Sequence, residues 1–149
     1  MSVQNFFSEA EKKQIIGAIK EAEMNTSGEI RLHVEGPCKS DVLDRAAYIF
    51  EKLGMHKTAL RNGVLFYLSV DDHKFAILGD AGINARVPAD FWDEIKETVL
   101  AGFKEGKYAE GLSKGIQMAG EKLKAEFPYV SGDKNELSDD ISFGEKQKS

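Results

Sequence analysis

The chain has 149 residues, of which 42% are hydrophobic and 30% charged, a composition that suits one globular domain with a buried core. Its net charge of -5 argues against nucleic acid as the main partner, because phosphate binding requires a basic surface. No apolar run approaches the ~18 residues of a membrane span, and residues 1–13 lack the regions of a secretory signal. The lone cysteine, Cys38, fits a reducing compartment, so we expect a cytoplasmic protein.

The first two elements are predicted to be a helix and a strand. A capping box, in which Ser8 and Glu11 satisfy each other's backbone N–H groups, opens a helix over residues 8–25. Alternating apolar and polar residues then predict a half-buried strand over residues 30–35. His33 lies on the polar face of this strand and is expected to be solvated.

The middle of the chain predicts a helix followed by a hairpin. Ser40 or Asp41 can cap a second helix, which ends at Gly54. Residues 63–70 are apolar almost throughout, which is typical of a strand covered on both faces. A turn at Asp71-Asp72 then leads into an antiparallel third strand.

The last part of the domain predicts two helices, one beginning near residues 88–90 and one over residues 108–123. The periodicity then ends, so the chain divides into a domain (1–128) and a flexible polar tail (129–149). Within that tail, residues 139–143 are either a solvated linker or a short partner-binding segment.

The element order is therefore α-β-α-β-β-α-α. The first two strands and the helix between them form a βαβ unit, so these strands are expected to be parallel, with a right-handed crossover. The third strand returns antiparallel. Because the second strand is apolar on both faces, helices must cover both sides of the sheet. The predicted fold is a three-layer α/β/α sandwich around a small mixed sheet.

This topology gathers polar side chains at one end of the sheet. Glu29 begins the first strand, Arg61 and Asn62 precede the second, Asp80 ends the third, and Asp90 opens the following helix. Hard divalent cations prefer several oxygen ligands, which carboxylates from separate turns can supply. We therefore predict a Ca²⁺ or Mg²⁺ site formed by Glu29, Asp80 and Asp90, with Arg61 and Asn62 as ligand-binding residues.

Simpler interpretations of the same residues remain open. Asp90 can be only a helix cap, and Arg61 can clamp a phosphate or form a structural ion pair with Glu29. Glu35 and the Asp71-Asp72 turn lie at the opposite end of the sheet, roughly 20 Å away. They therefore cannot share the predicted site.

Short blocks of the sequence resemble successive motifs of the TPM domain. They are residues 26–30 (TSGEI), 61–65 (RNGVL), 75–83 (FAILGDAGI) and 103–108 (FKEGKY). This family includes thylakoid-lumen phosphatase-like proteins, a photosystem II repair protein and a nematode receptor modulator. The resemblance implies an α/β/α sandwich, Ca²⁺ or Mg²⁺ binding, and the acid-phosphatase activity proposed for plant members. The family's acidic positions fall on Glu29 and Asp90, and its entry to the second strand falls on Arg61, Asn62 and Gly63.

Two functions follow as hypotheses. We favour a divalent-cation-binding domain that acts as an interaction or assembly and repair module with a protein partner, because it requires only carboxylates. The alternative is a metal-dependent, acid-phosphatase-like phosphomonoester hydrolase, in which Mg²⁺ would polarise the phosphoryl oxygen and Arg61 would neutralise developing charge. No nucleophile or general base is evident from residue type or spacing, so enzymatic activity is left undecided.

Overall fold

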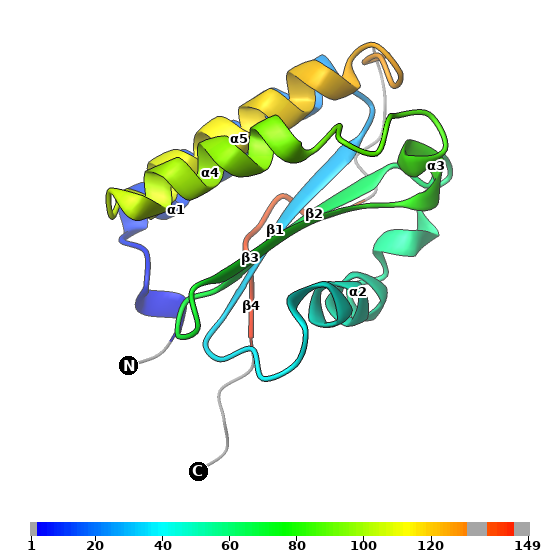
Figure 1. Ribbon diagram of the computed structural model, residues 1–149. Coiled ribbons are helices and arrows are strands. Elements are labelled where there is room, and N and C mark those ends of the chain that lie inside the picture. The colour runs from blue at the N-terminus through cyan, green and yellow to red at the C-terminus, as the bar shows by residue number, and fades with distance from the viewer. Residues whose placement is uncertain (1–2, 131–136, 145–149) are drawn as a thin grey trace.

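The computed structural model describes residues 3–130 and 137–144 (Figure 1). Within these ranges, four strands form one sheet in the order β3-β2-β1-β4. The strands are β1 (Glu29–Glu35), β2 (Gly63–Ser69), β3 (Lys74–Gly79) and β4 (Ser142–Phe143). The longer helices are α1 (Glu9–Asn25), α2 (Val42–Lys52), α4 (Asp93–Lys104) and α5 (Tyr108–Leu123). Short helical turns occur at η1 (Val3–Asn5), η2 (Met55–Lys57) and α3 (Ala81–Asn84).

Helices cover both faces of the sheet, as the sequence predicts. α1, α4 and α5 lie on one face and α2 lies on the other (Figure 1). Every residue of β2 is buried. Phe66 belongs to the core cluster under α1 and α5, whereas Tyr67 belongs to the cluster under α2. The alternation of these side chains explains why β2 is apolar on both faces and confirms the α/β/α sandwich.

The predicted strand directions are also confirmed. β1 and β2 are parallel, with register from Glu29 opposite Gly63 to Glu35 opposite Ser69, and α2 forms the crossover between them. β2 and β3 form an antiparallel hairpin. The carboxyl ends of β1 and β2 therefore meet beside Glu35 and Ser69.

Two predicted helix starts are built as expected. Ser8 and Glu11 form the reciprocal capping box of α1, with N···O distances of 2.9 and 3.1 Å. Asp41 caps α2 by accepting the backbone N–H groups of Leu43 and Asp44. None of the helices within residues 3–130 and 137–144 is long and apolar enough to cross a membrane.

The predicted start of the third helix, near residues 88–90, lies a few residues before the observed one. α4 begins at Asp93, with Trp92 rather than Asp90 at its N-cap position. Asp90 lies in the preceding turn, where its carbonyl accepts the backbone N–H of Asp93. Pro88 favours such a turn, because a proline fixes its own φ and lacks an N–H donor. The sequence pattern does not predict the short helix α3, which lies between β3 and this turn.

The strand β4 is a further difference from the sequence prediction, which assigned residues 129–149 to a flexible polar tail. Ser142 pairs with His33 and Phe143 with Val34, parallel to β1. Ile141, immediately before β4, is only 9% exposed. Pairing of this segment satisfies part of the β1 edge that would otherwise present free N–H and C=O groups. A strand of two residues is too short to produce a periodic signal.

Candidate functional site

Asp80, a predicted metal ligand, is instead hydrogen-bonded within the protein. Its two oxygens accept the Nε and Nη2 groups of Arg61, both at 2.8 Å, and Oδ1 also accepts the backbone N–H of Ala81 at 2.7 Å. The side chain is 6% exposed and caps α3. The hydrogen bond with Asp80 raises the pKa of Arg61. The structure thus pairs Arg61 with Asp80 rather than with Glu29, and both oxygens of Asp80 already have donors.

Close backbone packing fixes this Arg61 loop. Arg61 has a positive φ of 50°, and its carbonyl accepts the backbone N–H of Gly82 at 2.9 Å. A Cβ at Gly82 would lie 2.2 Å from the carbonyl oxygen of Leu60, so only glycine fits here. Asn62, the other predicted ligand-binding residue, is buried and donates its side-chain amide to the carbonyl of Ser27 at 3.2 Å.

Glu29 is buried at the start of β1, close to Glu23 of α1 and to residues 137–144. Its Oε1 accepts the backbone N–H of Leu137 at 2.9 Å. Burial raises the pKa of nearby Glu23 to about 9, and a hydrogen bond with Asp139 and the charges of Asp139 and Glu29 add to this shift. Glu29 therefore helps to fix residues 137–144 beside β1.

Asp90 is exposed in the turn before α4. Among residues 3–130 and 137–144, no group of three or more His, Cys, Asp or Glu side chains is arranged to hold a metal ion. With Arg61 bound to Asp80, the residues at this end do not fit a Ca²⁺ or Mg²⁺ ion as they stand. Cation binding by Glu29, Asp80 and Asp90 stays a prediction.

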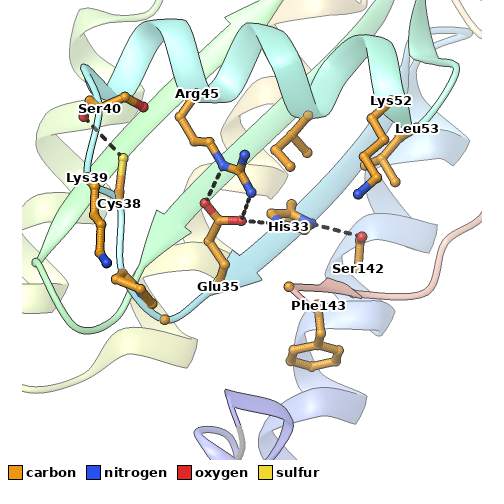
Figure 2. Close-up of a pocket in the computed structure, with 14 residues that line it drawn as sticks. His33, Glu35, Cys38, Lys39, Ser40, Arg45, Lys52, Leu53, Ser142 and Phe143 are labelled. Carbon is orange, nitrogen blue, oxygen red and sulfur yellow. Dashed lines mark hydrogen bonds and ion pairs between the residues drawn. The ribbon is translucent and has the colours of Figure 1, made fainter. Parts of the chain in front are cut away.

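The opposite end of the sheet holds a buried polar network centred on Glu35, whose side chain is 5% exposed. Arg45, from α2, donates its Nε to Oε2 at 2.8 Å and its Nη2 to Oε1 at 3.0 Å. His33 Nε2 lies 3.1 Å from Oε1, and the hydroxyl of Tyr67 donates to Oε2. Figure 2 shows Arg45 and His33 converging on this carboxylate.

This network fixes the protonation states of two of its members. Burial alone would raise the pKa of Glu35, but hydrogen bonds from His33, Arg45 and Tyr67 outweigh it and hold the value at about 2. Burial and the hydrogen bond to Glu35 raise the pKa of Tyr67. Glu35 is therefore ionised and Tyr67 is neutral at neutral pH. Four hydrogen bonds from these three residues make Glu35 an anchor for the loop after β1 rather than a proton-transfer group.

His33 is buried, at 3% exposure, so the prediction of a solvated side chain is wrong. The polar face of β1 is covered by α2 and by the segment that contains β4, so the alternation does not mark a solvent face. His33 Nδ1 lies 2.9 Å from the Ser142 hydroxyl. A signal was present in the sequence, since residues two apart on a strand share a face and His33 is followed by Glu35 at that spacing.

A pocket of about 560 Å³ lies over this network, between α2 and residues 142–144 (Figure 2). We call it the strand-end pocket, because it opens at the carboxyl end of β1, where parallel α/β sheets usually bind ligands. Its polar lining includes Lys39, Arg45, Lys52 and Ser142. Its apolar lining includes Ile49, Leu53 and Phe143.

The charge of the strand-end pocket is set by the Glu35–Arg45 pair. Because Arg45 neutralises Glu35, the exposed side chain of Lys39 gives the pocket a positive character. Figure 2 shows Lys52 reaching from α2 toward Ser142. The arrangement suits an anionic group held beside apolar walls.

The β2–β3 turn supports the loop that forms one wall of this pocket. Asp72 Oδ2 accepts the backbone N–H of Cys38 at 2.6 Å. Lys74 Nζ donates to the carbonyls of Cys38 and Ser40 at 3.1 and 3.3 Å. The hydrogen bond to Cys38 gives Asp72 a structural role beyond the turn itself. Cys38 is buried, at 3% exposure, and its thiol donates to the carbonyl of Ser40.

An α/β/α sandwich with a pocket at the carboxyl end of its parallel strands is an architecture shared by many small domains of differing function. The family model of the TPM domain matches residues 2–122, and the chain belongs to this family. Among solved structures, it is similar to the NMR structure of the BA42 protein from the psychrophilic bacterium Bizionia argentinensis. That similarity has a TM-score of 0.89 at 46% identity and covers 93% of this chain and 96% of BA42.

Two more distant structures share the fold. The N-terminal domain of a protein from P. gingivalis has a TM-score of 0.67 at 20% identity, covering 81% of this chain and 78% of that one. The N-terminal domain of the cg2496 protein from Corynebacterium glutamicum has a TM-score of 0.62 at 13% identity, covering 97% and 84%. A search of curated proteins gives no match.

Proposed function

We propose that this TPM domain is a non-enzymatic binding module that holds an anionic group in the strand-end pocket. One observation carries the proposal: the buried carboxylate of Glu35 is neutralised by Arg45, while the exposed cation of Lys39 stands at the pocket rim. A carboxylate or phosphate entering the pocket would therefore meet an excess of positive charge.

The size and walls of the pocket support a small ligand or an exposed group of a protein partner. Its volume of about 560 Å³ lies within the range of small-molecule sites. Ile49, Leu53 and Phe143 offer apolar surface beside the cationic rim. The favoured ligand has one anionic head and a compact apolar body, for which phenyl phosphate is a suitable probe.

Calorimetric titration of the full-length protein with phenyl phosphate tests this proposal. Lys39→Gln and Lys52→Gln are each expected to weaken binding about threefold to fivefold, as expected for the loss of one solvent-exposed charge contact. Lys57→Gln is the matched control, since Lys57 is exposed but does not line the pocket. Equal affinities in all three variants would count against the pocket as the binding site.

Phosphatase activity is the alternative function, and it can be separated from binding with a chromogenic substrate. A binding module is expected to bind p-nitrophenyl phosphate without releasing p-nitrophenol, with or without added Mg²⁺. Hydrolysis that Lys52→Gln reduces and Lys57→Gln leaves unchanged would favour the enzyme over the binding module.

Divalent-cation binding by Glu29, Asp80 and Asp90 is a separate proposal, supported by the family resemblance. Since Arg61 bonds both oxygens of Asp80, a cation must displace the guanidinium. Arg61→Gln is therefore expected to bind Ca²⁺ at least several-fold more tightly than the wild type, measured by calorimetry. Arg61→Gln combined with Asp80→Asn is the control and should lose this gain. If Arg61→Gln binds no more tightly than the wild type, the proposed cation site is wrong.

A further inference from the structure

Residues 137–144, which we call the C-terminal segment, follow β1 along its whole length. At the amino end, the backbone N–H of Leu137 donates to Glu29. At the carboxyl end, the backbone N–H of Gly144 donates to the carbonyl of Val34 at 2.8 Å. Ile141 is buried between these points. The C-terminal segment therefore runs parallel to one edge of the sheet and joins it as a strand at Ser142 and Phe143.

Specific side-chain contacts accompany this backbone pairing. The Ser142 hydroxyl lies 2.9 Å from His33 Nδ1, and the Phe143 ring lies under the ammonium of Lys12 at 5.7 Å from its centroid. A Cβ at Gly144 would lie 2.6 Å from the Cβ of Glu35, so this position accepts only glycine without a shift. The β1 edge thus has successive places for a hydroxyl, an aromatic ring and a glycine.

The edge also favours acidic residues before these positions. The charge of Asp140 acts on Arg31, whose pKa is lowered by burial. The Nε of Arg31 is buried and has no hydrogen-bond partner within residues 3–130 and 137–144. A peptide that placed a carboxylate closer to this donor would gain a charged hydrogen bond that Asp140 does not make.

The C-terminal segment is held with features that permit exchange. Only two of its residues form strand pairs with β1. Short pairing limits the stability of docking, whereas the backbone of β1 remains a template for any extended chain.

We propose that the β1 edge is a strand-addition site for an extended peptide of a partner protein, in which acidic residues precede an apolar–hydroxyl–aromatic–glycine sequence, and that the C-terminal segment occupies this site as an internal competitor. Main-chain hydrogen bonds supply the affinity of such sites and alternate side chains supply the specificity. Ser142, Phe143 and Gly144 also line the strand-end pocket, so exchange replaces one wall of that pocket. Strand addition does not depend on anion binding there.

Fluorescence anisotropy with a labelled peptide of residues 137–144 (LSDDISFG) and the full-length protein tests the proposal. Gly144→Ala in the protein weakens the internal competitor, so this variant is expected to bind the peptide about tenfold more tightly than the wild type. Gly17→Ala is the matched control, because a Cβ there meets no atom within 4 Å, and it should bind as the wild type does.

The peptide itself supplies the reciprocal test. A peptide with alanine at the position of Gly144 is expected to bind the Gly144→Ala protein about tenfold more weakly than LSDDISFG does. Ser142→Ala, which removes the hydrogen bond to His33, is a milder second variant and should also strengthen peptide binding. Equal binding of LSDDISFG to the wild type, Gly144→Ala and Ser142→Ala proteins, or amide shifts that fall away from residues 29–35, would overturn the proposal.

Discussion

Glu35→Ala is expected to lower the free energy of unfolding by about 3 kcal/mol, because it removes the shared acceptor of a buried network. Arg45, His33 and Tyr67 all bond this carboxylate in the folded protein. Without it, the hydroxyl of Tyr67 and the Nε2 of His33 are left without their present partner in the interior, where an unsatisfied polar group is costly. Urea unfolding followed by circular dichroism measures the loss.

Glu51→Ala is the matched control for this substitution. Glu51 is a glutamate of α2 whose side chain is exposed. Its removal should therefore change the unfolding free energy by less than about 0.5 kcal/mol. If Glu35→Ala and Glu51→Ala unfold at the same urea concentration, the Glu35 network does not stabilise the fold as we infer.

The pH dependence of stability gives Glu35 a second signature. Its pKa is about 2 in the folded protein, below the ordinary value of 4.5, so the folded state favours the ionised form. The resulting stability is present above about pH 4.5 and is lost as the pH falls toward 2. The Glu35→Ala variant should therefore lose less stability than the wild type across this interval.

Asp80→Ala is expected to lower the free energy of unfolding by about 2 kcal/mol, the second largest effect. The change removes the bidentate pair with Arg61 and the cap of α3 together. Asp90→Ala should change stability by less than about 0.5 kcal/mol, because Asp90 is exposed and contributes only its backbone carbonyl to the turn. Thermal or urea unfolding of both variants measures the contrast, and equal losses would contradict the separate roles assigned to these carboxylates.

Much of the fold could be predicted because local signals agree with the tertiary structure. The Ser8–Glu11 capping box, the apolar run of β2 and the turn at Asp71-Asp72 each identify an element from a few neighbouring residues. The βαβ rule then gives the parallel pairing of β1 with β2. These features depend on backbone geometry and on burial of whole faces, which the sequence pattern records directly.

The parts that could not be predicted depend on contacts between distant residues. β4 pairs across more than a hundred positions of sequence, through only two residues. His33 looks polar by alternation, and its burial follows only when α2 and the C-terminal segment cover that face. Likewise, the bond between Arg61 and Asp80 depends on how the α3 turn packs against the Arg61 loop.

The location of the candidate site could not be predicted either, because it depends on which carboxylates are neutralised by neighbouring side chains. Sequence topology correctly separates Glu35 and Asp72 from Glu29 and Asp80, at opposite ends of the sheet. It places the site at the end of Glu29, Asp80 and Asp90, because Asp71 and Asp72 are typical turn residues and the family resemblance supports that end. Neutralisation by a partner cannot be seen in a sequence. In the structure, Arg61 compensates Asp80 at one end, whereas at the other Arg45 compensates Glu35 beneath an open cationic pocket.

A two-dimensional ¹H–¹⁵N shift titration of the full-length protein with phenyl phosphate tests the location of binding most directly. We expect saturable shifts for the backbone amides of residues 38–40 and 142–144 and for Lys52, all at the strand-end pocket. The amides of residues 80–90 should stay unchanged. Saturable shifts confined to residues 80–90, or none anywhere, would contradict the assignment of ligand binding to the carboxyl end of β1.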